Sequence, residues 1–252
     1  MKPAKNIDPV RDRAVDLLLR VFHKDAYLSI VLDKSLEKHP LSGRGGRFLA
    51  QLVYGTTRHR ALCDFVLKKL VDQPLDRLPD PIRVILIMGV YQILFLNTTP
   101  LPAVVNSSVD LAQKWGHSGT ARLVNAVLRR VPPSLDKVHL PKFDRTPEWH
   151  LSLRYSIPEW LVRAWYEELG PETTMEVCRA LSEEAPVTLR TNTLRHTREE
   201  LAELLRKAEC EVRLPEFPPE AILMDSGLPP ARSKAFQRGD FFVQDVASML
   251  PP

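Results

Sequence analysis

The most apolar stretch of the chain, Ile82 to Leu96, places the strongest constraint on the fold. It reads IRVILIMGVYQILFL, with apolar residues on every side of a helical period. Such a helix must be surrounded by other elements, because any exposed face would leave apolar surface in water. The stretch is shorter than the roughly 20 residues that cross a bilayer, and it contains Arg83 and Gln92. It therefore predicts the central helix of a bundle, buried on most sides.

The segments on both sides of this stretch also follow a helical period. Asp8-Pro9 is a typical start for the first of them, and Pro132-Pro133 ends the last. Gly55 lies inside an expected helix, where a close helix–helix crossing would explain it. With short connections the segments predict a helical bundle. The other expected helices cover 10–24, 30–39 and 43–71, a segment from Pro102 through Trp115, and a last segment that ends at Arg130.

Basic residues are concentrated in the first half of the chain. Residues 1–135 hold 20 Lys and Arg against 11 Asp and Glu, a formal charge of +9. The rest holds 15 basic and 20 acidic residues, a charge of −5, so the total of +4 conceals the difference. A basic domain joined to an acidic one indicates that the first contacts a polyanion such as nucleic acid. Chance asymmetry of solvated side chains is the alternative.

The pattern changes after residue 135. Prolines interrupt any period over 136–157, which we expect to be a linker between a domain at 1–135 and a second one at 158–252. The fold class is thus mainly α, a helical bundle followed by a small α+β domain similar to RNA-recognition folds. We expect Trp160 and Trp165 in its core, and Thr197 with Glu200 as a capping box. The expected elements are helices at 159–169, 172–182 and 198–208 and strands at 187–191, 211–214, 221–224 and 240–244.

No pattern in the sequence indicates a metal site, a disulfide or export. Cys63, Cys178 and Cys210 lack CxxC spacing, and the histidines lack HxH or HExxH spacing. We expect all three cysteines to be structural. The N-terminus has no apolar segment of a secretory signal. We expect a cytoplasmic protein that does not enter a membrane.

Several stretches, read together, resemble one family. LVYGTTRHR (52–60), VVNSSVDLAQKWG (104–116) and RLVNAVLRR (122–130) resemble a NusB-type bundle. SIPEWLVRAWYEELG (156–170), TLRTNTLRHTREELAELLRKA (188–208) and FQRGDFFVQDVASML (236–250) resemble the next domain of bacterial 16S rRNA cytosine-5 methyltransferases of the RsmB (Sun, Fmu) type. The resemblance covers nearly the whole chain, and its pieces stand in the family's order.

The resemblance also implies parts that this chain does not contain. In the family, a Rossmann-like domain with a Gly-rich turn holds S-adenosylmethionine and carries the catalytic cysteines. After residue 119 this chain has only Gly170, Gly227 and Gly239, so it has no such turn. We therefore expect no cofactor and no catalytic residue here, and a chain that is inactive alone. It could be a truncated or split methyltransferase, whose catalytic domain is missing or separate. The alternative is a stand-alone NusB-like antitermination factor.

The candidate functional residues follow from the resemblance and from charge. Solvated helix-end charges or a flexible turn are the alternatives for the arginines of the first domain. Gln244 and Asp245 are expected where the family's small domain meets the catalytic one. The implied partner is RNA, with 16S rRNA as the specific expectation. The residues expected to contact it are Arg11, Arg13, Arg44, Arg47, Arg58, Arg60, Arg190 and Asn192.

Overall fold

The computed structural model describes residues 7–24, 26–41, 43–96, 99–183, 185–226, 230 and 233–250. The chain divides into two compact units, Met1–Ser182 and Glu183–Pro252. The boundary between the units, after Ser182, lies on the C-terminal side of the expected linker at 136–157. The reason is that two helices that follow residue 146 pack with the first unit. Gly227, one of the late glycines, lies outside the described residues.

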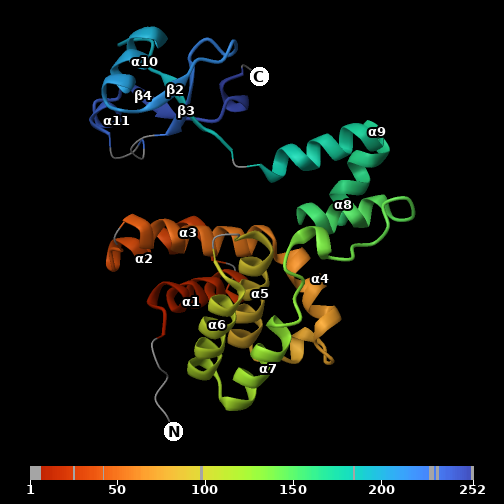
Figure 1. The fold of residues 1–252 in the computed structure, drawn as a ribbon. Coiled ribbons are helices and arrows are strands. Elements are labelled where there is room, and N and C mark those ends of the chain that lie inside the picture. The colour runs from red at the N-terminus through yellow and green to blue at the C-terminus, as the bar shows by residue number, and fades with distance from the viewer. Residues whose placement is uncertain are drawn as a thin grey trace. The chain divides into compact units, whose positions relative to one another are not determined.

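The first unit is helical throughout its regular elements (Figure 1). Its N-terminal helix begins as expected, since the Asp8 carboxylate accepts hydrogen bonds from the N–H groups of Val10 and Arg11. The helices are α1 (Pro9–His23), α2 (Leu28–Lys38), α3 (Gly43–Arg58), α4 (Arg60–Leu70), α5 (Asp80–Phe95), α6 (Leu101–Trp115), α7 (Ser118–Leu128), α8 (Pro147–Tyr155) and α9 (Glu159–Ser182), with short 3-10 turns at Leu75–Arg77 and Leu135–Lys137.

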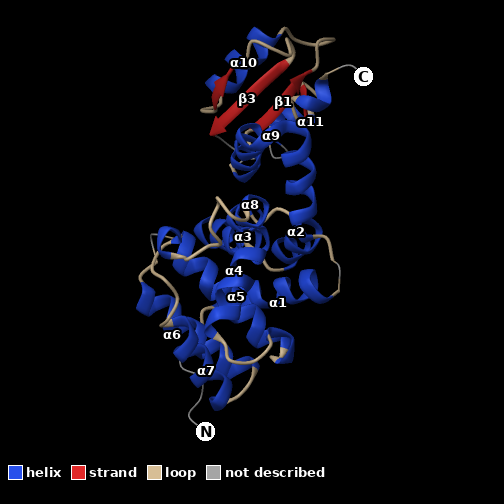
Figure 2. Ribbon diagram, turned by 90° about the vertical axis from the view of Figure 1, so that its right-hand side faces the viewer, coloured by secondary structure: helices blue, strands red, loops and turns tan. Residues whose placement is uncertain are grey.

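Helix α5 is the centre of the bundle, as its composition predicts. Every residue from Val84 to Leu94 is buried, and α1, α3, α4, α6 and α7 all contact it (Figure 2). Arg83, directly before this buried run, is only partly buried. Its Nη2 donates to Asp64 Oδ2 of α4 at 3.0 Å. In the part of the chain that the structure describes, no helix is both long and apolar enough to span a bilayer.

The expected continuous helix over 43–71 is wrong, because the chain turns at His59. The backbone there has φ −99° and ψ 19°, and α3 ends one residue before it. The His59 ring stacks on Phe95 of α5, with 3.9 Å between ring centroids. The turn lets α3 and α4 pack against α5 at different angles. No Pro or Gly marks it, so the periodicity alone did not reveal it.

The expected linker contains helix α8. Pro147 occupies its first turn, where a missing N–H is tolerated, so this proline starts a helix instead of preventing one. The helix contacts α4 through Trp149, whose ring meets Phe65 edge-on at 6.1 Å, and through nearby Ser156, whose Oγ accepts the Leu62 N–H at 3.4 Å. The long α9 is bent at Gly170, which has φ 78°, so it corresponds to the two expected helices.

One expectation about α9 is wrong. Trp165 packs at the edge of a small core made by α8 and α9, but Trp160 is 71% exposed. Trp160 stands in the first turn of the helix, so no neighbouring turn covers it.

The second unit is a four-stranded antiparallel sheet in the order β2–β3–β1–β4, covered on one face by α10 (Arg198–Lys207). Its core joins Leu201 and Leu205 of that helix to Leu189, Ile222 and Phe241 of the sheet. The capping box of Thr197 and Glu200 is formed. The strands are β1 (Val187–Thr191), β2 (Glu211–Arg213), β3 (Ala221–Ser226) and β4 (Phe241–Val243), and a short helix α11 (Lys234–Gln237) precedes β4. A helical bundle followed by a small α+β unit is therefore confirmed as the fold class.

Candidate nucleic-acid interface

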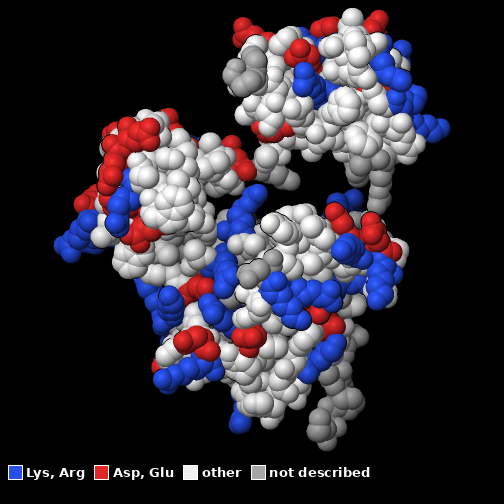
Figure 3. All heavy atoms as spheres, turned by 180° about the vertical axis from the view of Figure 1, so that it is seen from behind, with Lys and Arg blue, Asp and Glu red and all other residues white. Residues whose placement is uncertain are grey.

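The surface of the first unit carries many Lys and Arg side chains. Figure 3 shows them gathered over the middle of the bundle formed by α1–α7, with Asp and Glu more scattered. Many of these cations are held by carboxylates, as in the pair of Arg20 with Asp16 at 2.8 Å. The cations without a carboxylate partner are the ones that remain available for an external anion.

The start of α3 combines such cations with a helix N-terminus. Arg44 and Arg47 are exposed in its first two turns, and neither makes a hydrogen bond or ion pair with any described residue. The first turn contains no acidic residue. The helix dipole at this end favours an anion. A Cβ added at Gly45 would lie 3.9 Å from Val10 Cγ2. Helix α1 therefore packs beside this end of α3.

Arg13 lies on α1 close to the end of α2. Its Nη1 donates to the carbonyl oxygen of His39 at 2.7 Å, directly after α2. Lys38 and His39 are exposed there. This single neutral contact leaves the positive charge of Arg13 without a carboxylate partner among the described residues. We define Arg13, Arg44 and Arg47 as the α3 cluster.

The expected role of Arg11 does not fit its position. Its side chain is only 11% exposed and bonds the Asp8 carboxylate. Its Nε donates to Gln92 Oε1 of α5 at 2.8 Å, and its guanidinium carbon lies 4.9 Å from the centre of the Phe48 ring. These partners occupy Nη1, Nε and one face of a mostly buried guanidinium, which leaves little of it for a phosphate. Arg11 therefore joins α1 to α5, and we remove it from the interface.

Arg58 and Arg60 flank the turn between α3 and α4. Arg58 is exposed and makes no hydrogen bond or ion pair with a described residue. Arg60 is partly engaged, with its guanidinium 4.2 Å from the centre of the Phe22 ring and its Nε 3.8 Å from Asp64 Oδ2. The turn thus presents Arg58 as another exposed cation, on the same helix as Arg44 and Arg47.

His59 between them is not available as a cation. Burial, followed by the charge of Arg58, lowers its pKa to about 4, so its ring is neutral at pH 7. Its Nδ1 is buried without a hydrogen-bond partner among the described residues. The ring instead stacks with Phe95 and Tyr91 of α5.

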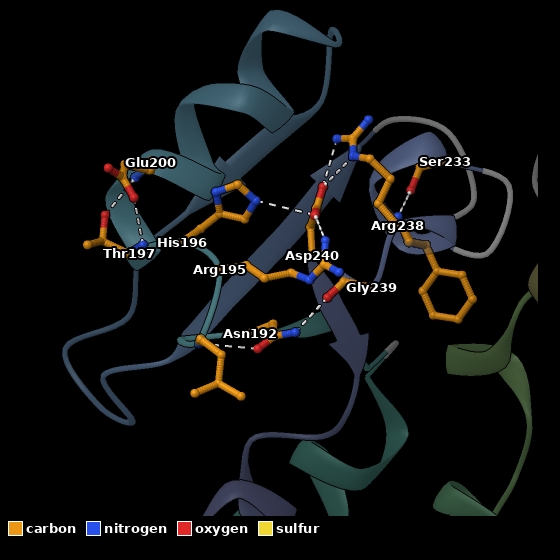
Figure 4. A network of polar contacts seen from close by, with 11 residues as sticks. Asn192, Arg195, His196, Thr197, Glu200, Ser233, Arg238, Gly239 and Asp240 are labelled. Carbon is orange, nitrogen blue, oxygen red and sulfur yellow. Dashed lines mark hydrogen bonds and ion pairs between the residues drawn. The ribbon is translucent and has the colours of Figure 1, made fainter.

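In the second unit, Arg190 and Asn192 lie at the end of β1 that meets β4. Arg190 is exposed, and its Nη1 lies 3.4 Å from Gln244 Oε1. Asn192 is used locally, because its Nδ2 donates to the Gly239 carbonyl at 2.8 Å and its Oδ1 accepts the Leu194 N–H at 3.2 Å (Figure 4). Asn192 therefore shapes the turn after β1, and Arg190 keeps a guanidinium without a carboxylate partner among the described residues.

Asp240, just before β4, holds two arginines and a histidine around that turn (Figure 4). Its side chain is 2% exposed and meets Arg238 at 2.7 Å, His196 at 3.3 Å and Arg195 at 3.8 Å. Burial would raise the pKa of Asp240, but hydrogen bonds from Arg238 and His196, together with their charges, lower it below its usual value. The carboxylate thus stays ionised and fixes the two segments to each other.

Gln244 and Asp245 follow β4 and make local contacts. Gln244 Nε2 donates to the Ser248 carbonyl at 2.8 Å, and Asp245 Oδ1 accepts the Ala247 N–H at 2.8 Å. Both stabilise the last described turn, and their expected role at a domain interface stays a prediction.

The three cysteines lie outside these clusters. Cys63, Cys178 and Cys210 are free and buried. Burial, followed by the Asp64 charge, raises the pKa of the Cys63 thiol, and burial raises that of Cys178. Such thiols are poor nucleophiles.

Among the described residues, no group of three His, Cys, Asp or Glu side chains is placed to hold a metal ion.

Phe242 was not singled out from the sequence, although it borders Arg190. It is 58% exposed and lies across from Arg190 in the pairing of β1 with β4. The sequence signal that could have identified Phe242 is the alternation of side chains along a strand. Because Phe241 enters the core, its neighbour Phe242 must face the other way.

Comparisons with known proteins divide the chain into two matched regions. Residues 8–132 match the NusB family, and residues 157–230 match the family described as "Methyltr_RsmF/B-like, ferredoxin-like domain". A solved structure described as "Crystal Structure of PH0851" has a similar fold, with a TM-score of 0.67 at 22% identity over 96% of this chain and 54% of that one.

Two curated relatives illustrate the same division. The "Probable ribosomal RNA small subunit methyltransferase B" of Bacillus subtilis (strain 168) is 31% identical over 243 residues, which are 96% of this chain and 53% of the relative. The "Transcription antitermination protein NusB" of Chloroflexus aggregans is 31% identical over 125 residues, which are 48% of this chain and 83% of the relative. The chain thus spans about half the length of the methyltransferase relatives that it matches.

Proposed function

Because this chain belongs to the NusB family in its first unit and carries the ferredoxin-like domain of RsmF/B-like methyltransferases after it, we propose that it is the part of an rRNA methyltransferase that binds ribosomal RNA. The observation that carries the proposal is the α3 cluster, whose arginines have no carboxylate partner among the described residues. It lies in a region with a formal charge of +9. Cations of this kind bind phosphates and release counterions.

The small-subunit RNA is the proposed target, since the relatives that match both regions are named for it. Cytosine-5 methylation is the reaction that the resemblance of the sequence motifs implies, and it is part of the proposal. The described residues do not fit S-adenosylmethionine. All strand pairs are antiparallel, and Gly239 is the one described glycine of the second unit, so no parallel strand leads into a Gly-rich turn there. We derive no methyl-transfer step for these residues.

A NusB-like antitermination factor is the second candidate. The similarity to the Chloroflexus aggregans protein favours it for the first unit only. The match over 157–230 to a methyltransferase family favours the first candidate for the chain as a whole.

Replacement of Arg44 and Arg47 tests the proposed function. In the full chain, Arg44→Gln with Arg47→Gln removes two phosphate contacts. We expect affinity for 16S rRNA fragments to fall roughly 15- to 30-fold at 0.15 M salt, and the slope of log affinity against log salt to decrease by about 1.4 to 1.8. Fluorescence anisotropy over a salt series measures both quantities.

Two variants serve as controls for this test. Arg163→Gln also removes one exposed arginine, but that residue pairs with Glu159 at 2.9 Å on α9, and we expect unchanged binding. Arg11→Gln should lower stability and leave the salt slope unchanged, because Arg11 is engaged inside the bundle. Equal slopes for the Arg44/Arg47 variant and the parent chain would refute the proposed interface.

A further inference from the structure

The sheet of the second unit has one face that α10 does not cover. Along β1, Leu189 points into the core beneath α10, so Thr188 and Arg190 face the other way. The same alternation places Phe242 of β4 and Ala221 of β3 on this face, where both pair with Arg190 in the register. Phe242, Arg190 and Ala221 therefore form one row across three strands.

A hollow of about 410 Å³ opens at the β4 end of this row. We call it the β1–β4 hollow. Two segments form its walls. One is the end of β1 together with the turn after it, and the other is β4 together with the residue that follows. Leu194 is 95% exposed at its rim, and Phe242 is 58% exposed. The lining residues are Arg190, Thr191, Asn192, Thr193, Leu194, Phe242, Val243 and Gln244.

The charge of the hollow is positive. No acidic residue lines it, and Arg190 is its one charged lining residue. Arg190 makes only a long contact, 3.4 Å, with the neutral amide of Gln244. Its charge has no carboxylate partner among the described residues. On the same sheet face Arg213 is different, because Asp225 holds it in a bidentate pair with bonds of 2.5 and 2.7 Å.

The turn beside the hollow is held rigid. Asn192 bonds Gly239 and Leu194, and Asp240 holds Arg195, His196 and Arg238, as described above (Figure 4). These contacts keep Leu194 and Phe242 exposed on either side of the hollow. An exposed aromatic ring, an exposed aliphatic side chain and an unpaired guanidinium are thus fixed close together.

We propose that the β1–β4 hollow binds one unstacked nucleotide of single-stranded RNA. The base stacks on the Phe242 ring and packs against Leu194, and the adjoining phosphate pairs with Arg190. Stacking on an aromatic side chain combined with a backbone cation is the general chemistry of single-strand recognition. A base-paired nucleotide cannot enter, because its ring faces are already stacked. The inference rests on the proposed function, since it assigns a second RNA contact to the same chain.

The charge distribution favours RNA over a protein segment as the occupant. An apolar peptide would bury the Arg190 guanidinium without a counter-charge, which costs free energy. A phosphate supplies that counter-charge next to an aromatic surface.

Variants of Phe242 in the full chain test the proposal. For a single-stranded 16S rRNA oligonucleotide we expect Phe242→Ala to weaken binding about fivefold to 150-fold. Phe242→Leu, which keeps an apolar side chain without a ring, should weaken binding similarly. Phe242→Trp should bind at least as tightly as the parent chain. Since Phe242 is mostly exposed, all three should fold, which circular dichroism checks.

Matched controls separate this site from the α3 cluster. Phe217→Ala removes another exposed aromatic ring, outside the hollow, and should not change binding. The Phe242 variants should leave affinity for duplex RNA and the salt slope unchanged. Arg190→Gln should reduce the slope for single strands by about 0.7.

The outcomes distinguish the two proposals. Loss of binding in the Arg44/Arg47 variant with no effect of Phe242→Ala would overturn the hollow as a nucleotide site and leave the proposed function standing. Equal losses for Phe242→Ala and Phe242→Trp would also overturn it, because stacking tolerates any aromatic ring. No RNA binding by the parent chain would refute the proposed function itself.

Discussion

At the scale of single residues, His59 is a side chain whose pKa the fold shifts strongly. Its pKa falls from an ordinary 6.5 to about 4, first through burial and then through the charge of Arg58. The unfolded chain therefore takes up a proton between these two values while the folded chain stays neutral at this site. The contribution of the neutral His59 ring to the unfolding free energy is therefore fully present above pH 6.5. It is lost as the pH falls toward 4.

This difference predicts an acid-sensitive first unit. After allowance for partial exposure of the ring, we expect the unfolding free energy to fall by roughly 1 kcal/mol between pH 7 and pH 5 on account of His59. His59→Phe keeps an aromatic ring on Phe95 and removes the titration, so its pH dependence should be smaller. Urea unfolding at both pH values measures the effect. An identical pH dependence in both proteins would contradict the assignment.

Residue-scale predictions from sequence succeeded where the partner is local. The caps by Asp8 and by Thr197 with Glu200 were predictable because donor and acceptor lie within three residues. Arg11 and Arg13 stand two residues apart with the same charge, yet one bonds Gln92, 81 residues away, and the other reaches the end of α2. Only the tertiary fold decides which arginine remains free.

At the scale of elements, Gly55 shows how α3 and α5 fit together. An added Cβ there would lie 2.0 Å from both Cζ and Oη of Tyr91. The Tyr91 ring of α5 therefore occupies the space that a side chain would take. This explains a glycine inside a helix, where it costs up to about 1 kcal/mol relative to alanine.

The pair Gly55→Ala and Gly45→Ala tests this packing within one helix. We expect Gly55→Ala to destabilise the protein by about 1–3 kcal/mol, since the crossing must widen. At Gly45 an added Cβ meets its nearest neighbour, Leu41 Cβ, at 3.6 Å, an ordinary contact. Alanine there should be neutral or stabilise by up to about 1 kcal/mol. Chemical denaturation ranks the two variants, and equal stabilities would rule out the crossing as the reason for Gly55.

Element prediction failed at one turn without a sequence marker and at one proline whose effect was misjudged. The break at His59 contains neither Pro nor Gly, and α8 begins at a proline that sequence reasoning took as an interruption. The strands and α10 of the second unit were predictable from alternation and capping, to within a few residues. The β1–β4 hollow was not, because it requires β1 and β4 to lie side by side, and Thr191 and Phe241, where the two strands come closest in sequence, are 50 positions apart.

At the scale of the whole molecule, the two units have separate cores. The first has α5 at its centre, and the second is formed by α10 and the sheet. Segments between compact units are cut first by proteases, because few contacts resist their local opening.

Limited proteolysis should therefore locate the boundary. Glu183 and Glu184 follow the last residue of the first unit. We expect a glutamate-specific protease to cut the native chain there first and to leave the glutamates of α9, such as Glu167, intact. Intact-mass analysis identifies the products. Digestion in urea is the control, and first cleavage inside α9 would contradict the division.

The bond between Arg11 and Gln92 has a consequence for how the bundle chooses its arrangement. Hydrophobic contacts are not directional, so a helix as apolar as α5 could rotate against α1 with little change in buried area. A rotation by one residue, about 100°, would break the hydrogen bond between the Arg11 guanidinium and the buried Gln92 amide. The amide would then lack this partner inside the bundle, which costs free energy. Together with the bonds from Lys114 and Trp115 of α6 to Asp12 of α1, this polar contact favours one docking of the first helix. These contacts thereby fix which face of α1 turns outward, and with it the side on which Arg13 reaches the end of α2.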